Sequence, residues 1–326
     1  MNWLRKSAAT SSSSVAKTEM EGAYHIPVML HESVEGLQID PDGIYVDATF
    51  GGGGHSLEIL NRLKSGRLLG FDQDPDARAN APEDTRFTFI AANFRHAQRY
   101  LRAAGVGQVD GILADLGVSS HHFDAPERGF SIRYDAPLDM RMDQQKSQTA
   151  AGIVNTYPEE KLVQMLAAYG EVKSPRKVAN RLIQARSNGP IGTTFELIEA
   201  LRPVTPRHKE YRFQAQVFQA FRMEVNQELQ ALEALLEQST ALIKPGGRLA
   251  VITYHSLEDR LVKHYLRTGN AEGKLEKDFF GNPIRPFRPT QSKPIIPTES
   301  ELNANNRSRS AKLRVAERIE LPKQAR

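Results

Sequence analysis

The apolar positions in the first third of the chain alternate between short continuous runs and helical spacing. The runs, which are typical of β-strands, lie at 44–46, 67–71, 87–90 and 109–113. Helical stretches fit after the first three, near 57–63, 75–80 and 95–104. Strands that alternate with helices favour a parallel sheet with right-handed crossover connections. The pattern therefore predicts an α/β fold.

The pattern changes after Asp115. Residues 135–212 contain no convincing strand, but their apolar residues recur at helical spacing. From Phe218 to Leu236, apolar residues at steps of three and four predict one long helix. A fifth strand is expected at 248–254, followed by a helix that Ser256 caps.

These changes predict how the chain is divided. We expect a leader at 1–22, a sheet domain formed by 23–134 and 213–326, and a helical insertion at 135–212. The leader is rich in serine and predicted to be disordered, with an organellar transit peptide as the alternative.

Composition narrows the class of protein. No run approaches the length of a membrane span, and the absence of cysteine excludes disulfides, thiolate nucleophiles and cysteine zinc sites. We expect a cytoplasmic protein. The net charge of +4 is uneven, because residues 260–326 carry 15 Lys or Arg against 7 Asp or Glu. This basic segment indicates either a polyanionic partner or a solvated tail.

Acidic residues and glycines follow the predicted strands. Asp47, Asp72 and Asp115 end the first, second and fourth strands, and 51–54 are four glycines. Parallel sheets bind ligands beyond the carboxyl ends of their strands. An acid about 20 residues after the glycines can accept hydrogen bonds from ribose hydroxyl groups. A nicotinamide site would need G-x-G-x-x-G directly after the strand. Here an acid ends the strand and G-x-G follows four residues later, which is typical of methyltransferases that use S-adenosylmethionine.

Several longer strings carry a specific resemblance. They are His25-Ile-Pro-Val-Met-Leu30, Gly52-Gly-Gly-His-Ser56, Asp115-Leu-Gly-Val-Ser-Ser120, Glu127-Arg-Gly-Phe130, Pro137-Leu-Asp-Met-Arg-Met-Asp143, Phe218-Gln-Ala-Phe-Arg222, Val225-Asn226, His255-Ser-Leu-Glu-Asp-Arg260 and Arg309-Ser-Ala-Lys-Leu-Arg314. In this order they resemble the bacterial ribosomal RNA small-subunit methyltransferase H family, also called MraW-type enzymes. The resemblance covers about residues 24–319.

The resemblance implies a class I (Rossmann-like) methyltransferase sheet of seven strands with an inserted helical domain. It also implies N4-methylation of a cytidine in the decoding region of 16S ribosomal RNA. The family's contacts to S-adenosylmethionine would fall on Gly53, Gly54, His55, Asp72, Phe94, Asp115 and His122. Many relatives have Gln where this chain has His122. Asp47, at the end of the first strand, is a further candidate cofactor contact.

An exocyclic cytosine amine is a poor nucleophile because its lone pair is delocalised into the ring. A carboxylate that accepts its N–H bonds would help. We expect Asp115 to orient either this amine or the amino group of the cofactor, while Ser119 and Ser120 wall the base pocket. His255 is a candidate for binding RNA or positioning the base. The chemistry needs no metal, and none is expected.

Two further segments are candidates for contacting RNA. Asp139, Arg141 and Asp143 alternate with apolar residues, so half of that string is expected to pack and half to contact substrate. The other set is the basic run Arg307, Arg309, Lys312 and Arg314, which would bind phosphates, form an edge strand with one charged face, or do both.

Other functions stay open at this point. The alternatives are a methyltransferase that acts on an amine of DNA or protein, a non-catalytic ribosome-assembly factor with this fold, and a nicotinamide oxidoreductase. The oligomeric state is open too, with a homodimer as one alternative.

Overall fold

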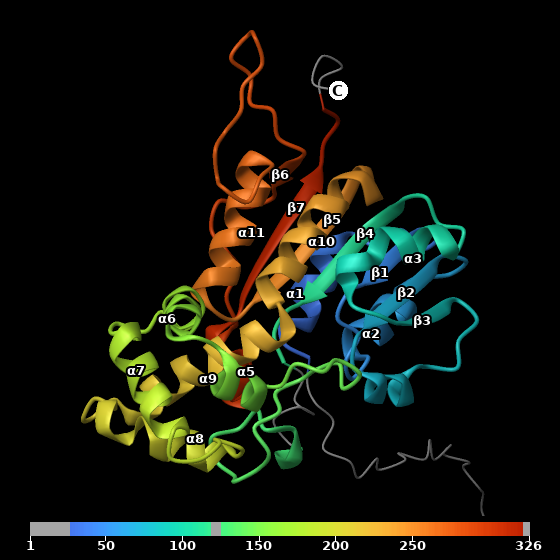
Figure 1. Cartoon of the computed structure of the whole chain (residues 1–326). Coiled ribbons are helices and arrows are strands. Elements are labelled where there is room, and N and C mark those ends of the chain that lie inside the picture. The colour runs from blue at the N-terminus through green and yellow to red at the C-terminus, as the bar shows by residue number, and fades with distance from the viewer. Residues whose placement is uncertain (1–26, 119–124, 322–326) are drawn as a thin grey trace, which may run out of the picture.

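The four apolar runs of the first third form neighbouring parallel strands in the computed structural model, which describes residues 27–118 and 125–321 (Figure 1). These strands are β1 (Ile44–Asp47), β2 (Arg67–Asp72), β3 (Phe87–Ala91) and β4 (Val109–Asp115). They pair in the order β3-β2-β1-β4. Each of these four predicted strands is therefore present, within two residues of its expected bounds, whereas the fifth, expected at 248–254, begins earlier, at Ile243.

The sheet is completed by strands from the last third of the chain. They are β5 (Ile243–Thr253), β6 (Phe287–Pro289) and β7 (Lys312–Arg318). Strand β5 runs parallel to β4, and β7 is antiparallel to β5. The full order is β3-β2-β1-β4-β5-β7-β6, so β7 lies between β5 and β6. The alternative of an edge strand was wrong for this segment.

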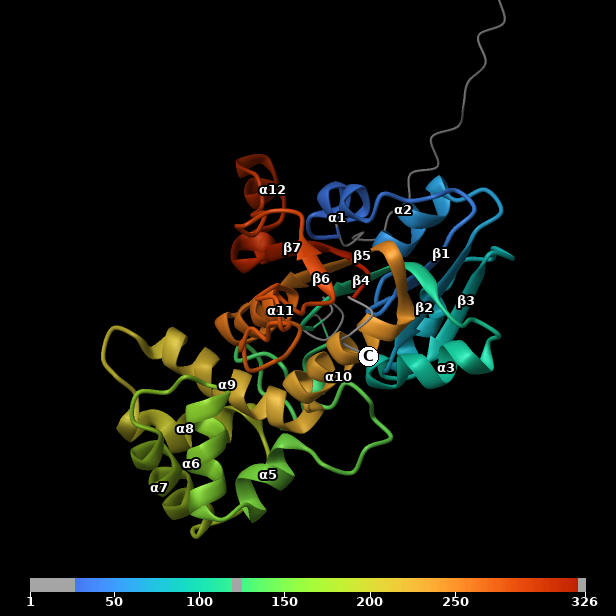
Figure 2. The same cartoon turned by 90° about the horizontal axis from the view of Figure 1, so that it is seen from above.

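Helices cover both faces of the sheet (Figure 2). One face packs against α1 (Leu30–Leu37) and α2 (Gly54–Arg62), through a cluster that includes Tyr45, Leu68 and Leu113. The other face packs against α3 (Ala97–Ala103), α10 (Glu228–Leu242) and α11 (Ser256–Thr268). Buried apolar area on both faces is typical of parallel sheets and stabilises the layered arrangement.

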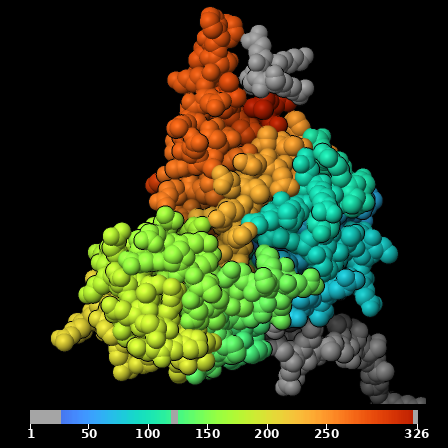
Figure 3. All heavy atoms as spheres, in the orientation of Figure 1, coloured from blue at the N-terminus to red at the C-terminus, as the bar shows by residue number. Residues whose placement is uncertain are grey.

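A second apolar cluster holds the helical unit together. Its helices are α5 (Ala150–Thr156), α6 (Glu159–Ala168), α7 (Pro175–Arg186), α8 (Thr194–Leu201) and α9 (Glu210–Asn226). Their buried side chains pack with one another and with the chain around Phe130, Leu138 and Met142. In the space-filling view this unit, green to yellow, lies beside the sheet half (Figure 3). The expected domain bounds stay a prediction.

The predicted helix from Phe218 to Leu236 is two helices. Gln227 separates α9 from α10, with φ of 52° in the left-handed region. The side chain of Asn226, directly before the break, accepts a hydrogen bond from Met142 N and donates one to Met140 O. The helix therefore ends where a distant loop is fastened to it.

Short elements complete the described chain. They are the 3-10 turns η1 (Pro75–Asn80), η2 (Phe94–His96), η3 (Pro126–Arg128), η4 (Arg202–Val204) and η5 (Asn306–Ser310), and the helix α12 (Glu299–Ala304). Among the described residues, none of the helices has the length and apolarity to cross a membrane. The predicted leader lies outside the described residues.

Candidate active site at the strand ends

The loop after β1 joins three neighbouring strand ends. Thr49 Oγ1 accepts a hydrogen bond of 2.7 Å from the amide of Asp115, at the end of β4. The amide of Gly51 donates to Asp72 Oδ2 at 2.8 Å, at the end of β2. The loop therefore brings the acids predicted for β2 and β4 to one edge of the sheet.

Asp47 lies beneath this loop and is fully buried. Its carboxylate accepts hydrogen bonds from Ser56 Oγ at 2.7 Å and from Thr49 N at 3.0 Å. Burial raises the pKa of Asp47 to about 6, although the bonds from Ser56 and Thr49 oppose this rise. Asp47 thus shapes the loop, and its direct contact with a cofactor stays a prediction.

The glycines of the loop meet different surroundings. Gly53 has φ of 79°, a conformation that favours glycine, and a Cβ on Gly54 would lie 2.1 Å from Pro27 Cγ. A Cβ on Gly52 would meet nothing within 4 Å. Gly53 and Gly54 are therefore required by the fold itself, whereas Gly52 borders open space where a ligand could approach.

Asp115 is held between two polar side chains. The hydroxyl of Tyr254, just after β5, donates to Asp115 Oδ1 at 2.7 Å, and His55 Nδ1 lies 3.9 Å from Oδ2. Burial raises the pKa of Asp115 to about 7. The hydrogen bond from Tyr254 lowers it in part, and the charge of Asp47 raises it further. A carboxyl group with this pKa can exchange a proton near neutral pH.

His55 and Tyr254 are themselves fixed. The buried His55 places Nε2 3.1 Å from the carbonyl oxygen of Val28. Burial, and then the charge of Asp115, raise the pKa of Tyr254 well above its usual value, so its hydroxyl stays protonated as a donor. The surroundings of Asp115 are therefore preorganised rather than dependent on exposed side chains.

His255 caps α11. Its Nδ1 accepts from the amide of Glu258 at 3.4 Å, and its Nε2 lies 3.1 Å from Glu258 Oε1 without good hydrogen-bond alignment. Ser256, expected to be the cap, is the first helical residue instead, and its hydroxyl donates to Glu171 at 2.7 Å. His255 thus has a structural task, and its catalytic role stays a prediction.

Glu228, His255 and Glu258 converge so closely that their potential ligand atoms lie within 4.8 Å of one another. Arg222 forms two hydrogen bonds of 2.8 Å with the carboxylate of Glu228. The guanidinium group supplies a positive charge beside this cluster. Burial tends to raise the pKa of Glu258, but His255, the amide of Tyr254 and Arg222 outweigh it and lower that pKa.

Two charged residues of the 139–146 loop, Asp139 and Arg141, pair with each other. Arg141 forms hydrogen bonds of 2.7 and 2.6 Å with the two carboxylate oxygens of Asp139, and it also donates to the carbonyl groups of Gln144 and Lys146. Asp143 accepts from the amide of Gln145 at 3.0 Å. The interleaved apolar residues, Leu138, Met140 and Met142, are buried as predicted. The charged residues stay predicted substrate contacts.

Arg128 connects this loop to the strand ends. It is buried, and it donates to Asp74 Oδ2 at 3.0 Å and to Asp76 Oδ2 at 3.2 Å. The same guanidinium group donates to the carbonyl oxygens of Arg141 and Met142. The chain after β2 and the 139–146 loop are therefore held by one side chain.

The remaining predicted site residues belong to other elements of the fold. Phe94 begins η2 after β3 and packs partly against the sheet core. Arg309 lies in η5, whereas Lys312 and Arg314 belong to β7. Ser119, Ser120 and His122 lie outside the described residues.

The strand order, the antiparallel β7 and the acidic strand ends together define a class I, Rossmann-like methyltransferase fold, as predicted. The comparisons with known proteins then place it more narrowly. The chain belongs to the MraW methylase family, whose model matches residues 22–319.

Its relatives match over nearly their full length. The chain is 57% identical to the ribosomal RNA small subunit methyltransferase H of Parabacteroides distasonis, covering 92% of this chain and 99% of the relative. The proteins of the same name from Bacteroides thetaiotaomicron and Cytophaga hutchinsonii are also 57% identical, covering 91% and 90% of this chain and 98% and 99% of those relatives. The family resemblance is confirmed, and the cofactor is S-adenosylmethionine.

The strand-end site fits such a cofactor. Gly52 leaves open space beside the loop, and Asp72 stands at the end of β2 with its position fixed by the amides of Gly51 and Asp74. A carboxylate fixed at this strand end is suited to accept hydrogen bonds from ribose hydroxyl groups.

Sequence reasoning missed the partners that position the site. Tyr254 ends the predicted fifth strand and directly follows the observed β5, so the same strand-end argument could have found it. Arg128 and Asn226 stood within recognised strings, but nothing in the sequence showed what they contact. The contacts of Arg128 with Asp74, of Asn226 with Met140 and of Tyr254 with Asp115 each join residues more than 50 positions apart.

Proposed function

We propose that this chain transfers a methyl group to the exocyclic amino nitrogen (N4) of a cytidine in the decoding region of 16S ribosomal RNA. The observation that carries the proposal is the carboxylate of Asp115, held by Tyr254 beside the glycine loop. The relatives' name, ribosomal RNA small subunit methyltransferase H, supports small-subunit RNA as the substrate class.

When bound, S-adenosylmethionine supplies a methyl group that is already activated by positively charged sulfur. The nucleophile needs more help, because the amine lone pair is delocalised into the base. Asp115 accepts an N–H bond from the amine and favours a pyramidal nitrogen. With a pKa of about 7, the same carboxylate can hold the proton that the amine loses on methylation.

Other residues bind and orient in this proposal. Gly53, Gly54, His55, Asp72 and Phe94 are the proposed cofactor contacts. The target base must leave its stack to reach Asp115, and the proposed inserted domain at 135–212, which contains α5 to α8 of the helical unit, forms the second wall for it. We also propose that the enzyme works in the cytoplasm, where ribosomal subunits are assembled.

The decisive experiment supplies labelled S-adenosylmethionine and small subunits from a strain without its own enzyme. Nucleoside mass analysis should find N4-methylcytidine at one decoding-region position. DNA, protein and naked RNA serve as parallel substrates. Methyl transfer to DNA or protein alone would support the alternative amine substrates. Cofactor binding without transfer to any of the four would favour the non-catalytic assembly factor.

A further inference from the structure

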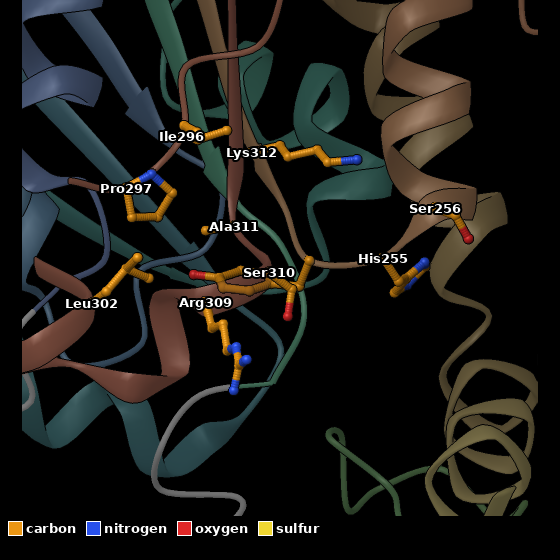
Figure 4. Close-up of a pocket in the computed structure, with 10 residues that line it drawn as sticks. His255, Ser256, Ile296, Pro297, Leu302, Arg309, Ser310, Ala311 and Lys312 are labelled. Atoms are coloured by element: carbon orange, nitrogen blue, oxygen red, sulfur yellow. The ribbon is translucent and has the colours of Figure 1, made fainter. Parts of the chain in front are cut away.

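A cavity of about 330 Å³ opens between the N-terminal end of α11 and the chain that leads into β7 (Figure 4). The residues that line it come from three parts of the chain: 254–256, 296–297 with Leu302, and 309–312. Ligand pockets in proteins span about 300–1,000 Å³, so this cavity suits one small group such as a single nucleotide. The methyl-transfer mechanism makes no use of it.

One wall of the cavity is apolar. It is formed by Ile296, Pro297 and Leu302, and His255 and Ser256 stand on the opposite side (Figure 4). Ile296 is 65% exposed and Leu302 is 37% exposed, so neither contributes much to the core. An exposed apolar wall of this kind suits the flat face of an unstacked base.

Two positively charged residues, Arg309 and Lys312, line the cavity. Arg309 is exposed, and the side chain of Lys312 is 42% exposed although it lies 3.3 Å from Asp259. Arg314 pairs with the same carboxylate at 2.8 Å and is only 11% exposed. One acid therefore faces two cations, and Arg309 adds a third. The exposed Arg309 and the half-exposed Lys312 suit a phosphate group.

The cavity adjoins the proposed methyl-transfer site. Tyr254 lines the cavity, and its hydroxyl donates to Asp115. Tyr254 is thus shared by the two places, so an RNA strand whose cytidine reaches Asp115 can place its next nucleotide near the cavity.

From these contacts we propose that the cavity binds a nucleotide that flanks the target cytidine. Its base lies against Ile296, Pro297 and Leu302, and its phosphate is bound by Arg309 and Lys312. This inference rests on the proposed function, because it takes the substrate to be single-stranded RNA that enters the strand-end site.

The test measures binding of a labelled single-stranded oligoribonucleotide containing one cytidine to the full chain saturated with S-adenosylhomocysteine. Fluorescence anisotropy is recorded over a series of salt concentrations. The variants are Arg309→Ala and Ile296→Ser. Matched controls are Arg202→Ala, an arginine in the helical unit with 76% side-chain exposure, and Leu275→Ser, an apolar residue that is 46% exposed away from the cavity.

Arg309→Ala should weaken binding about three- to tenfold and reduce the slope of log affinity against log salt by about 0.7, the value for one phosphate contact on a single strand. Ile296→Ser should weaken binding to a similar degree with the slope unchanged, because it removes contact with a base. Both controls should bind like the wild type. If each variant matches its control in affinity and slope, the proposal is wrong.

Failure of this inference can be told apart from failure of the proposed function. Each preparation is also assayed for methyl transfer to small subunits, and its unfolding temperature confirms that it is folded. If the wild type transfers the methyl group normally and the variants bind RNA as their controls do, the proposed role of the cavity is wrong and the proposed function stands. If both variants bind RNA more weakly but the wild type transfers no methyl group, the cavity binds RNA and the proposed function is wrong.

Discussion

The strand-end site and the 139–146 loop both contain acids, but the acids are held in different ways. At the strand ends, Asp47 and Asp115 accept hydrogen bonds from hydroxyl groups, and burial raises their pKa values to about 6 and about 7. In the loop, burial also tends to raise the pKa of Asp139, but its bonds with Arg141 outweigh this and lower it.

The difference shows what each region can do. An acid held by neutral donors can gain or lose a proton near neutral pH, which proton transfer requires. An acid paired with a guanidinium group stays ionised and serves to fix the chain. The strand ends are therefore suited to chemistry, and the 139–146 loop is suited to holding its own shape.

The largest effect is expected where the two regions are joined. Arg128→Met leaves the buried carboxylate of Asp74 without this partner and releases the carbonyl groups of the loop. Removing one member of a buried ion pair costs on the order of 3 kcal/mol. Urea unfolding should show this loss in the free energy of unfolding. Arg202→Met, at an exposed ion pair, should change it by less than about 0.5 kcal/mol. Equal effects of the two variants would contradict the connecting role of Arg128.

The next effect tests the strand-end acid directly. Asp115→Asn keeps the size of the side chain but removes the base, so turnover in the subunit assay should fall about 100-fold or more. Affinity for S-adenosylmethionine is measured separately by calorimetry.

The matched control is Asp110→Asn, which changes an acid at the opposite end of the same strand. Asp110 pairs with Lys244 and accepts from the amide of Ile44, so its loss should affect stability rather than turnover. Unchanged turnover and cofactor affinity in Asp115→Asn would show that Asp115 takes no part in the reaction.

Much of the sheet and of the strand-end site could be predicted because the signals are local. Apolar runs predict the strands. An acid at the end of a run is therefore predicted to lie at the edge of the sheet. Parallel pairing then places Asp72 and Asp115 at the same edge of the sheet, on either side of β1, without any knowledge of side-chain contacts.

The features that were missed depend on contacts between distant parts of the chain. The break at Gln227 interrupts a regular apolar spacing, and no glycine or proline marks it. It follows an asparagine whose side chain fastens the loop at Met140 and Met142. The 139–143 string likewise shows alternation, but its spacing does not reveal that Asp139 and Arg141 bind each other.

A smaller effect concerns the pH dependence of the strand ends. Asp115 must be ionised to accept a hydrogen bond and then a proton from the amine, so kcat/KM should rise with pH through about 7. The hydrogen bond from Tyr254 stabilises the ionised form and lowers the pKa of Asp115. Tyr254→Phe removes it, so the midpoint of the profile should move to higher pH, with part of the rate restored there. An unmoved midpoint would mean that Tyr254 does not set the ionisation of Asp115.

The smallest effect lies in the loop. Asp139→Asn, Arg141→Gln and the double variant form a cycle that isolates the free energy of coupling between the two side chains. About 1 kcal/mol or less is expected, since both are about one-quarter exposed. Because the pKa of Asp139 is lowered in the folded protein, its stabilising contribution is present above the unfolded value near 4 and is lost as pH falls below it. The coupling should therefore persist at pH 7 and disappear in acid. A coupling of zero at pH 7 would instead leave Asp139 and Arg141 available to the RNA and remove the contrast between the two regions.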